Sequence, residues 1–288
     1  MAAMIYNRAD WLAATRRRVL LFGMSGLGKT YLASMLRAGS EGWFHYSVDY
    51  RIGTRYMGEH IADNFKREAM KVPFLRELLM SDSVYIASNI TFDNLAPLST
   101  YLGKPGDPDK GGLAFGEYQR RQDQHREAEK AALRDTRPFI ERAGAIYDLP
   151  HFVCDSGGSI CEVVDPDDPA DPILTRLSED LLMVWIEGSD AHTDELVRRF
   201  DRAPKPMYYQ PGFLARMWEG YRAERGLSEA QVDPDDFVRW TYRQALDHRQ
   251  PRYAAMARNW GVSVRAEDVA LVRDEKDFTS LIAAALPA

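Results

Sequence analysis

One stretch of the chain has the residue types and the spacing of a phosphate-binding loop. Residues 23–30 read G-x-x-x-x-G-K-T, with both glycines, the lysine and the threonine in place. Glycines let backbone N–H groups turn inward around phosphates, and a helix that starts there points its positive end at them. Lys29 is expected to reach the β- and γ-phosphates, and the Thr30 hydroxyl to hold Mg²⁺. The residues predicted to contact the nucleotide are Gly23, Met24, Ser25, Gly26, Leu27, Gly28, Lys29, Thr30 and Tyr31.

The flanking sequence supplies the elements that position such a loop. The apolar run at 19–22 predicts a buried parallel strand, and residues 31–37 have apolar side chains at helical spacing up to Gly39. A glycine-rich turn that binds nothing is the alternative. The complete motif between a strand and a helix favours binding of a nucleoside triphosphate, with ATP and Mg²⁺ as the expected cofactors.

Length and charge restrict the class of protein. The chain has 288 residues, more than one mononucleotide-binding unit needs. We therefore expect one α/β domain over residues 1–288 with helical insertions at 56–145, where an acceptor would bind, and at 207–260. The net charge is −6, from 43 acidic and 37 basic residues, so the chain lacks the charge of a general nucleic-acid binder.

Cysteine usage and hydropathy point to a reducing, aqueous compartment. Cys154 and Cys161 have neither zinc-ligand nor redox spacing, which predicts buried structural thiols. No apolar run approaches the roughly 18 residues of a membrane span. We expect a soluble, cytoplasmic protein that does not bind a membrane.

A second strand is predicted at residues 43–48, and charged side chains follow it. Ligands of open parallel sheets bind at the carboxyl ends of the strands. Asp49 therefore lies where an acceptor hydroxyl would be handled, and Arg51 and Arg55 could grip an anionic group. A helix cap with two surface arginines is the alternative.

A third strand, at 151–154, ends in the segment Asp155-Ser156-Gly157-Gly158. An acid at this place commonly orders Mg²⁺, so Asp155 is expected to share the metal with Thr30. Gly157 and Gly158 offer backbone N–H groups as a second anion nest. Glu162 lies three residues after Ser159, the spacing of a capping box, which predicts that it closes a helix start.

The remaining elements complete the core. A fourth strand is predicted at 181–186, then a helix over 194–200 and a basic turn through residue 206. Arg198, Arg199 and Arg202 could form a lid that brings positive charge onto a transferring phosphate, although basic residues at a helix end also complement the helix dipole. A fifth strand is predicted at 261–264.

Other stretches predict secondary structure and no chemistry. Residues 58–80 predict a helix broken at Pro73, residues 83–87 are too short to assign to strand or helix, and residues 115–134 predict a charged helix. The aromatic stripe within 211–260 predicts core packing. The arginine triplet at 16–18 is typical of a solvated strand flank.

Taken together, these motifs resemble the small P-loop kinases of the shikimate, gluconate and nucleoside monophosphate kinase type. The resemblance rests on the loop and helix at 19–37, the strand ending at Asp49, the segment beginning at Asp155, and the strand, helix and turn at 181–206. It implies a three-layer αβα fold with a five-stranded parallel sheet in the order 2-3-1-4-5. It also implies a phosphoryl acceptor near Asp49, Arg51 and the glycine pair at 157–158. The long insertions depart from these kinases, so the identity of the acceptor does not transfer.

The mechanism expected for such a site is phosphoryl transfer to a small anionic acceptor, with Asp49 taking or orienting the hydroxyl proton and Arg199 or Arg202 stabilising the transition-state charge. The competing class is an ATPase that acts on a partner through the helical insertions, although Ser156 stands where such ATPases often place a glutamate. A nucleotide-binding scaffold without turnover is the third possibility.

Overall fold

The computed structural model describes residues 5–288 and divides into two compact units. The sheet unit comprises the chain up to Val48, Lys130–Pro204 and Arg239–Ala288. The helical unit comprises Asp49–Glu129 and Lys205–Val238. The predicted phosphate loop therefore belongs entirely to the sheet unit.

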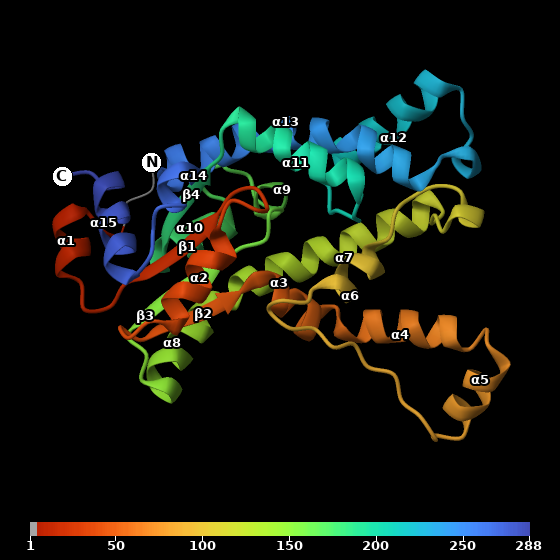
Figure 1. Cartoon of the computed structure of the whole chain (residues 1–288), viewed down its shortest axis with the longest axis horizontal. Coiled ribbons are helices and arrows are strands. Elements are labelled where there is room, and N and C mark those ends of the chain that lie inside the picture. Colours follow the sequence, from red (N-terminus) through yellow and green to blue (C-terminus); the bar gives the residue numbers. More distant parts are fainter. Residues whose placement is uncertain (1–4) are drawn as a thin grey trace. The chain divides into compact units, whose positions relative to one another are not determined.

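The sheet unit is built on five parallel strands in the order β2-β3-β1-β4-β5. The strands are β1 (Arg18–Phe22), β2 (Trp43–Ser47), β3 (His151–Asp155), β4 (Leu182–Glu187) and β5 (Gly261–Arg265). β3 and β4 are buried along almost their whole length because helices flank the sheet on both faces (Figure 1). This architecture confirms the predicted α/β fold and its strand order.

The register of the strands places the chemistry at one edge of the sheet. Leu21 of β1 pairs with Asp155 of β3, and Asp155 pairs in turn with Ser47 of β2. These residues lie at the carboxyl ends of their strands. The three segments in which the sequence predicts function thus begin at the same edge.

Helices of the sheet unit follow most of these strand ends. They are α1 (Arg8–Ala13), α2 (Lys29–Ala38), α8 (Thr136–Tyr147), α9 (Ile160–Val163), α10 (Pro172–Asp180), α11 (Asp190–Arg202), α14 (Ala266–Val269) and α15 (Glu275–Ala285). The long helix α13 (Pro234–Trp260) contributes its residues from Arg239 onward to this unit. α8 was not predicted, and Val48 starts a helix where the sequence predicts the last residue of a strand.

The helical unit contains the first predicted insertion only as far as Glu129, together with the start of the second. Its elements are α3 (Val48–Arg51), the π-helix η1 (Ile52–Tyr56), α4 (Gly58–Ala69), α5 (Pro73–Met80), α6 (Ala96–Leu102), the 3₁₀ turn η2 (Pro108–Lys110), α7 (Phe115–Arg134), α12 (Pro211–Arg225) and the 3₁₀ turn η3 (Glu229–Gln231). α3 begins, and α7 ends, in the sheet unit. The predicted break before Pro73 and the predicted helix at 115–134 are confirmed.

One glutamine and one aromatic pair join the two chain segments of the helical unit. The Gln122 side chain donates to the Met207 carbonyl at 3.0 Å and accepts from the Tyr209 N–H at 2.9 Å. The Phe115 and Trp218 rings stack with their centroids 4.5 Å apart. α7 therefore holds the segment that enters α12 through both backbone bonds and ring packing.

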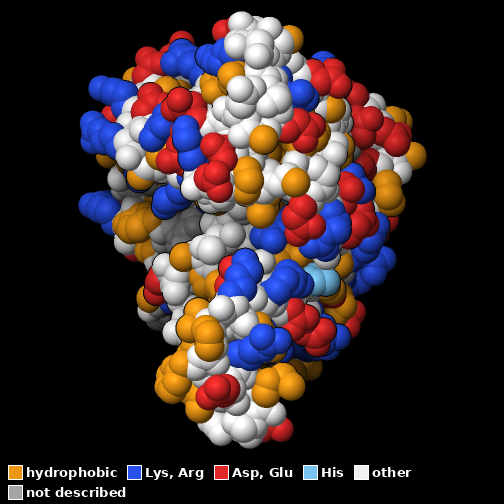
Figure 2. Space-filling model, turned by 90° about the vertical axis from the view of Figure 1, so that its right-hand side faces the viewer, with side chains coloured by type: hydrophobic (Ala, Val, Ile, Leu, Met, Phe, Trp, Pro, Cys, Tyr) orange, Lys and Arg blue, Asp and Glu red, His pale blue; other side chains and the backbone are white. Residues whose placement is uncertain are grey.

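Helix α5 leaves its apolar side chains on the surface. None of its residues is buried, and Phe74 and Met80 are 68% and 73% exposed. Hydrophobic side chains gather at the lower end of the face drawn in Figure 2, where α5 lies. The following residues 83–87 form neither strand nor helix, and Tyr85 is 88% exposed. α5 therefore adds nothing to the core of the helical unit.

Within residues 5–288, no helix is long and apolar enough to cross a lipid bilayer.

Candidate functional site

The predicted phosphate loop joins β1 to α2 as the sequence requires. Gly26 and Gly28 have φ angles of +84° and +97°, and Gly28 is the residue that caps the start of α2. Ser25, Gly26 and Thr30 are exposed, while Met24 and Leu27 on either side are buried. The loop is thus anchored by its apolar residues and open at its centre.

Lys29 folds back into the loop from the first turn of α2. Its ammonium group donates to the carbonyl oxygens of Gly23 and Met24 at 2.9 and 2.8 Å. The residue is only 6% exposed. A positive charge therefore lies against the backbone that forms the loop, where an incoming phosphate would replace water and carbonyl partners.

Gly23 allows the loop to pass closely over the neighbouring strand. A Cβ atom at this position would lie 2.6 Å from the Ile186 carbonyl oxygen of β4, and the φ angle is +135°. Both the space and the backbone angle exclude any other residue without a shift of the loop.

We expect Gly23→Ala to destabilise the sheet unit by about 2–4 kcal/mol, because it combines a strained backbone angle with a clash against backbone. Urea unfolding followed by circular dichroism measures the change. Gly116→Ala is the matched control, since a Cβ there meets nothing within 4 Å inside α7 and should raise stability slightly. Equal stabilities for the two variants would contradict the close approach.

Asp155 and Ser156 lie beside the loop at the end of β3. Asp155 is 6% exposed, and its carboxylate lies 3.8 Å from the Nε2 atom of the His45 ring, longer than a hydrogen bond. The Ser156 hydroxyl donates to the Leu21 carbonyl at 2.9 Å, and its N–H also points at that oxygen. Ser156 thus holds the segment after β3 against β1, and its hydroxyl proton is used in this hydrogen bond.

Gly158, the second glycine after Ser156, lies close to the phosphate loop. A Cβ at Gly158 would lie 3.5 Å from the Ser25 nitrogen and 3.8 Å from the Gly23 carbonyl oxygen. The Tyr253 hydroxyl of α13 donates to the Gly158 carbonyl. Tyr253 is fully buried, and burial raises the pKa of its hydroxyl well above the ordinary value, so the group stays a donor. The predicted second nest therefore adjoins the first.

The prediction of a capping box at Ser159 and Glu162 is wrong. The Ser159 side chain makes no capping bond to α9. The Glu162 carboxylate accepts instead from the Arg249 guanidinium of α13 at 2.6 Å and lies 3.6 Å from the His248 ring. Burial favours the neutral acid, but the Arg249 charge and the hydrogen bonds from His248 and Arg249 outweigh it and lower the pKa of Glu162 to about 2.

Helix α13 is thus a support of the site that the sequence did not reveal. Arg249, Arg252 and Tyr253 all bond to the segment after β3, with Arg252 donating to the Cys161 and Val164 carbonyls at 2.6 and 2.8 Å. These partners lie about 90 residues away in the chain. No local spacing encodes such contacts.

Among the arginines predicted for a lid, Arg199 lies against the loop. An ideal Cβ at Gly26 would be 3.8 Å from its Nη1 atom and 3.4 Å from Leu196, one turn earlier on α11. Arg198 pairs with Glu195 at 3.1 Å, and Arg202 is exposed at the end of the helix. α11 therefore presents one guanidinium to the centre of the phosphate loop.

The predicted acceptor residues follow β2 directly but belong to the helical unit. Asp49 and Arg51 lie in α3, and Arg55 lies in the π-helix η1. The Arg51 guanidinium is 5.7 Å from the Tyr56 ring centroid, and Arg55 is exposed. Their role toward a substrate stays a prediction from the sequence.

Both residues predicted to hold Mg²⁺ have oxygen donors suited to it. Thr30 is exposed at the start of α2, and Asp155 is a nearly buried carboxylate at the adjacent strand end. Mg²⁺ prefers few protein oxygens together with water and phosphate oxygens. The donor set therefore fits a nucleotide-bound Mg²⁺, and residues 5–288 hold no cluster of three or more His, Cys, Asp or Glu that could bind a metal by itself.

Both cysteines are free and buried, as predicted. Burial raises the pKa of the Cys161 thiol to about 12, so it is protonated and unreactive at neutral pH.

The chain thus combines a five-stranded parallel sheet in the order β2-β3-β1-β4-β5 with a phosphate-loop motif after β1. No protein-family model and no curated protein matches the chain. A search of solved structures finds similarity to the crystal structure of shikimate kinase from Bacteroides thetaiotaomicron, with 16% identity and a TM-score of 0.39. That match covers 92% of this chain and 94% of the other.

Proposed function

We propose that the protein is a Mg-ATP-dependent phosphotransferase that moves a γ-phosphate to a hydroxyl or phosphate of an anionic small molecule. The observation that carries the proposal is the convergence of three cationic or N–H-bearing groups on one loop. Lys29 lies inside it, Gly158 adjoins Ser25, and Arg199 lies against Gly26. Phosphoryl transfer requires positioning and charge neutralisation more than covalent chemistry.

Each group has a distinct role in this proposal. Lys29 and the loop N–H groups would bind the β- and γ-phosphates. Thr30 and Asp155 would hold Mg²⁺, which screens the phosphate charge when bound. Arg199 would stabilise the charge that develops on the transferred group, with Arg202 as a second candidate.

The acceptor side of the proposal rests on chain position. Asp49 would accept or orient the proton of the acceptor, and Arg51 and Arg55 would anchor its anionic group. Gly157 and Gly158 would offer N–H groups to an anionic group at the end of β3. Ser156 is unsuited to be the water-activating base of an ATPase, because a neutral hydroxyl is far less basic than the carboxylate of a glutamate, and its proton is donated to the Leu21 carbonyl.

The decisive experiment measures ATP consumption by the purified protein with Mg²⁺, first alone and then with pooled metabolite fractions. We expect turnover that depends on one fraction and is absent from a Lys29→Ala variant. Equal turnover without any acceptor would establish the ATPase instead. Tight binding of ATP without turnover under any condition would establish a nucleotide-binding scaffold.

We expect Arg199→Ala to lower turnover by about 10-fold or more while the Kd for ATP changes less, because the guanidinium would act mainly on the transition state. Arg198→Ala is the matched control on the same helix, since that residue pairs with Glu195. Single-turnover kinetics separates the chemical step from binding. Equal losses in the two variants would contradict a specific role for Arg199.

A further inference from the structure

A second concave site lies at the opposite edge of the same sheet. A pocket of about 920 Å³ is lined by residues that precede or begin the strands, among them Arg18, the first residue of β1, and His151, the first residue of β3. The phosphate loop follows the carboxyl end of β1, so the pocket lies at the other end of that strand. Its volume is within the range of small-molecule sites.

The three arginines at 16–18 have different surroundings: one makes internal contacts, and the other two line the pocket. Arg17 is used internally: its guanidinium donates to the Trp11 carbonyl at 3.2 Å, lies over the Trp11 ring and pairs with Glu41 at 3.6 Å. Arg16 and Arg18 line the pocket instead. Within the described chain, neither of these two side chains has an ion pair.

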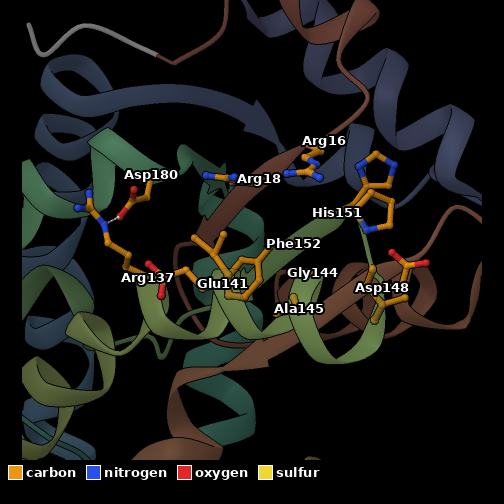
Figure 3. Close-up of a pocket in the computed structure, with 14 residues that line it drawn as sticks. Arg16, Arg18, Arg137, Glu141, Gly144, Ala145, Asp148, His151, Phe152 and Asp180 are labelled. Atoms are coloured by element: carbon orange, nitrogen blue, oxygen red, sulfur yellow. Dashed lines mark hydrogen bonds and ion pairs between the residues drawn. The ribbon is translucent and has the colours of Figure 1, made fainter.

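The wall of the pocket that lies opposite Arg16 and Arg18 carries two acidic side chains and leaves room for a ligand. Figure 3 shows Arg16 and Arg18 on one side of Phe152 and the helix α8, with its residues Gly144 and Ala145, on the other. A Cβ at Gly144 would meet nothing within 4 Å. The exposed acids Glu141 and Asp148 lie along this wall.

The other charged groups of the pocket are already partnered or neutral. Arg137 donates to Asp180 at 2.6 Å, the pair joined by the dashed line in Figure 3. The His151 Nδ1 accepts from the Arg17 N–H at 2.9 Å. Burial, with the nearby Arg17 charge, lowers the pKa of His151 to about 4, so it is a neutral ring at pH 7. Arg16 and Arg18 are therefore the cations left for a ligand.

We propose that this pocket binds a small organic phosphate, with the phosphate between Arg16 and Arg18 and a hydroxyl- or amine-bearing remainder facing Glu141 and Asp148. Two guanidinium groups match the charge of a phosphate monoester and offer forked donors to its three oxygens. The acids on α8 would accept hydrogen bonds from the remainder. The proposal does not depend on the phosphoryl transfer proposed for the loop at the other edge.

The test titrates glycerol 3-phosphate into the Lys29→Ala protein and follows the ligand by ³¹P NMR line width, so that the phosphate loop is impaired in every sample. We expect saturable binding, weakened at least 10-fold by the double substitution Arg16→Ala and Arg18→Ala. Arg142→Ala, which removes an exposed arginine of α8 outside the pocket, should leave binding unchanged. Gly144→Leu should weaken binding by filling the pocket without changing its charge.

Three results would overturn the proposal. One is equal binding of glycerol 3-phosphate by the Lys29→Ala protein and by the same protein with Arg16→Ala and Arg18→Ala added. Another is binding of malonate under the same conditions with none of glycerol 3-phosphate, which would assign a dicarboxylate. The third is tighter binding of a short single-stranded RNA that Gly144→Leu does not affect, which would assign an open nucleic-acid surface. Circular dichroism of each variant verifies that it is folded.

Discussion

Replacing Lys29 by alanine is expected to lower nucleotide turnover by at least about 10²-fold, the magnitude typical for removal of one charge-stabilising donor from a reacting phosphate or oxyanion. The loss of two hydrogen bonds to loop carbonyls should cost only about 1–2 kcal/mol of stability, because the strand, the helix and the glycine angles of the loop are unchanged. Turnover and urea unfolding of the same preparation measure both effects.

Two further lysine variants make the test specific. Lys29→Arg keeps the charge, but the side chain is 6% exposed and its site leaves little room for a planar fork, so turnover should also fall. Lys66→Ala removes a surface lysine that pairs with Asp63 and should change nothing. Turnover of Lys29→Ala within about threefold of the parent protein would refute a role of this ammonium in phosphate chemistry.

Elements that lie between two layers could be predicted closely from the sequence. All five strands were expected within a residue or two of their bounds, and β1, β3 and β4 appear as short apolar runs because both of their faces are buried. α8 escaped prediction because only Thr136 and Ala143 of its residues are buried, which leaves a weak apolar period. Residues 83–87 could not be assigned because the stretch is too short to show a period, and the structure places it in neither strand nor helix.

In the site, features formed by one contiguous segment could be predicted from the sequence, whereas contacts between distant segments could not. The phosphate loop is contiguous, and its geometry follows from the angles that Gly26 and Gly28 adopt. Arg198, Arg199 and Arg202 were named together from the basic end of the helix after the fourth strand, and the sequence alone could not single out Arg199 as the one that lies beside Gly26. The bonds from Arg249 and Tyr253 could not be predicted, because they join residues about 90 positions apart on elements whose docking no single-sequence pattern describes.

The buried ion pair between Glu162 and Arg249 supports the segment after β3, and its loss should lower the stability of the protein measurably. We expect Glu162→Gln to lower the free energy of unfolding at pH 7 by about 3–5 kcal/mol, since it leaves the Arg249 guanidinium buried without a counter-charge. Urea unfolding measures the change. Glu224→Gln is the matched control, because that residue pairs with Arg225 at the surface and should contribute less than about 1 kcal/mol.

The pH dependence of the same variant provides the sharper test. The pKa of Glu162 is about 2 in the folded protein against an ordinary value of 4.5, a difference equivalent to about 3 kcal/mol. A depressed carboxyl pKa stabilises the fold above the unfolded value and loses that contribution as pH falls through the folded one. The difference in stability between the parent protein and Glu162→Gln should therefore be constant from pH 7 to about pH 5 and shrink between about pH 4.5 and pH 2. A difference that stays constant down to pH 3 would mean that the carboxylate is not the charge holding Arg249, and that α13 supports the glycine pair by packing and the Tyr253 bond alone.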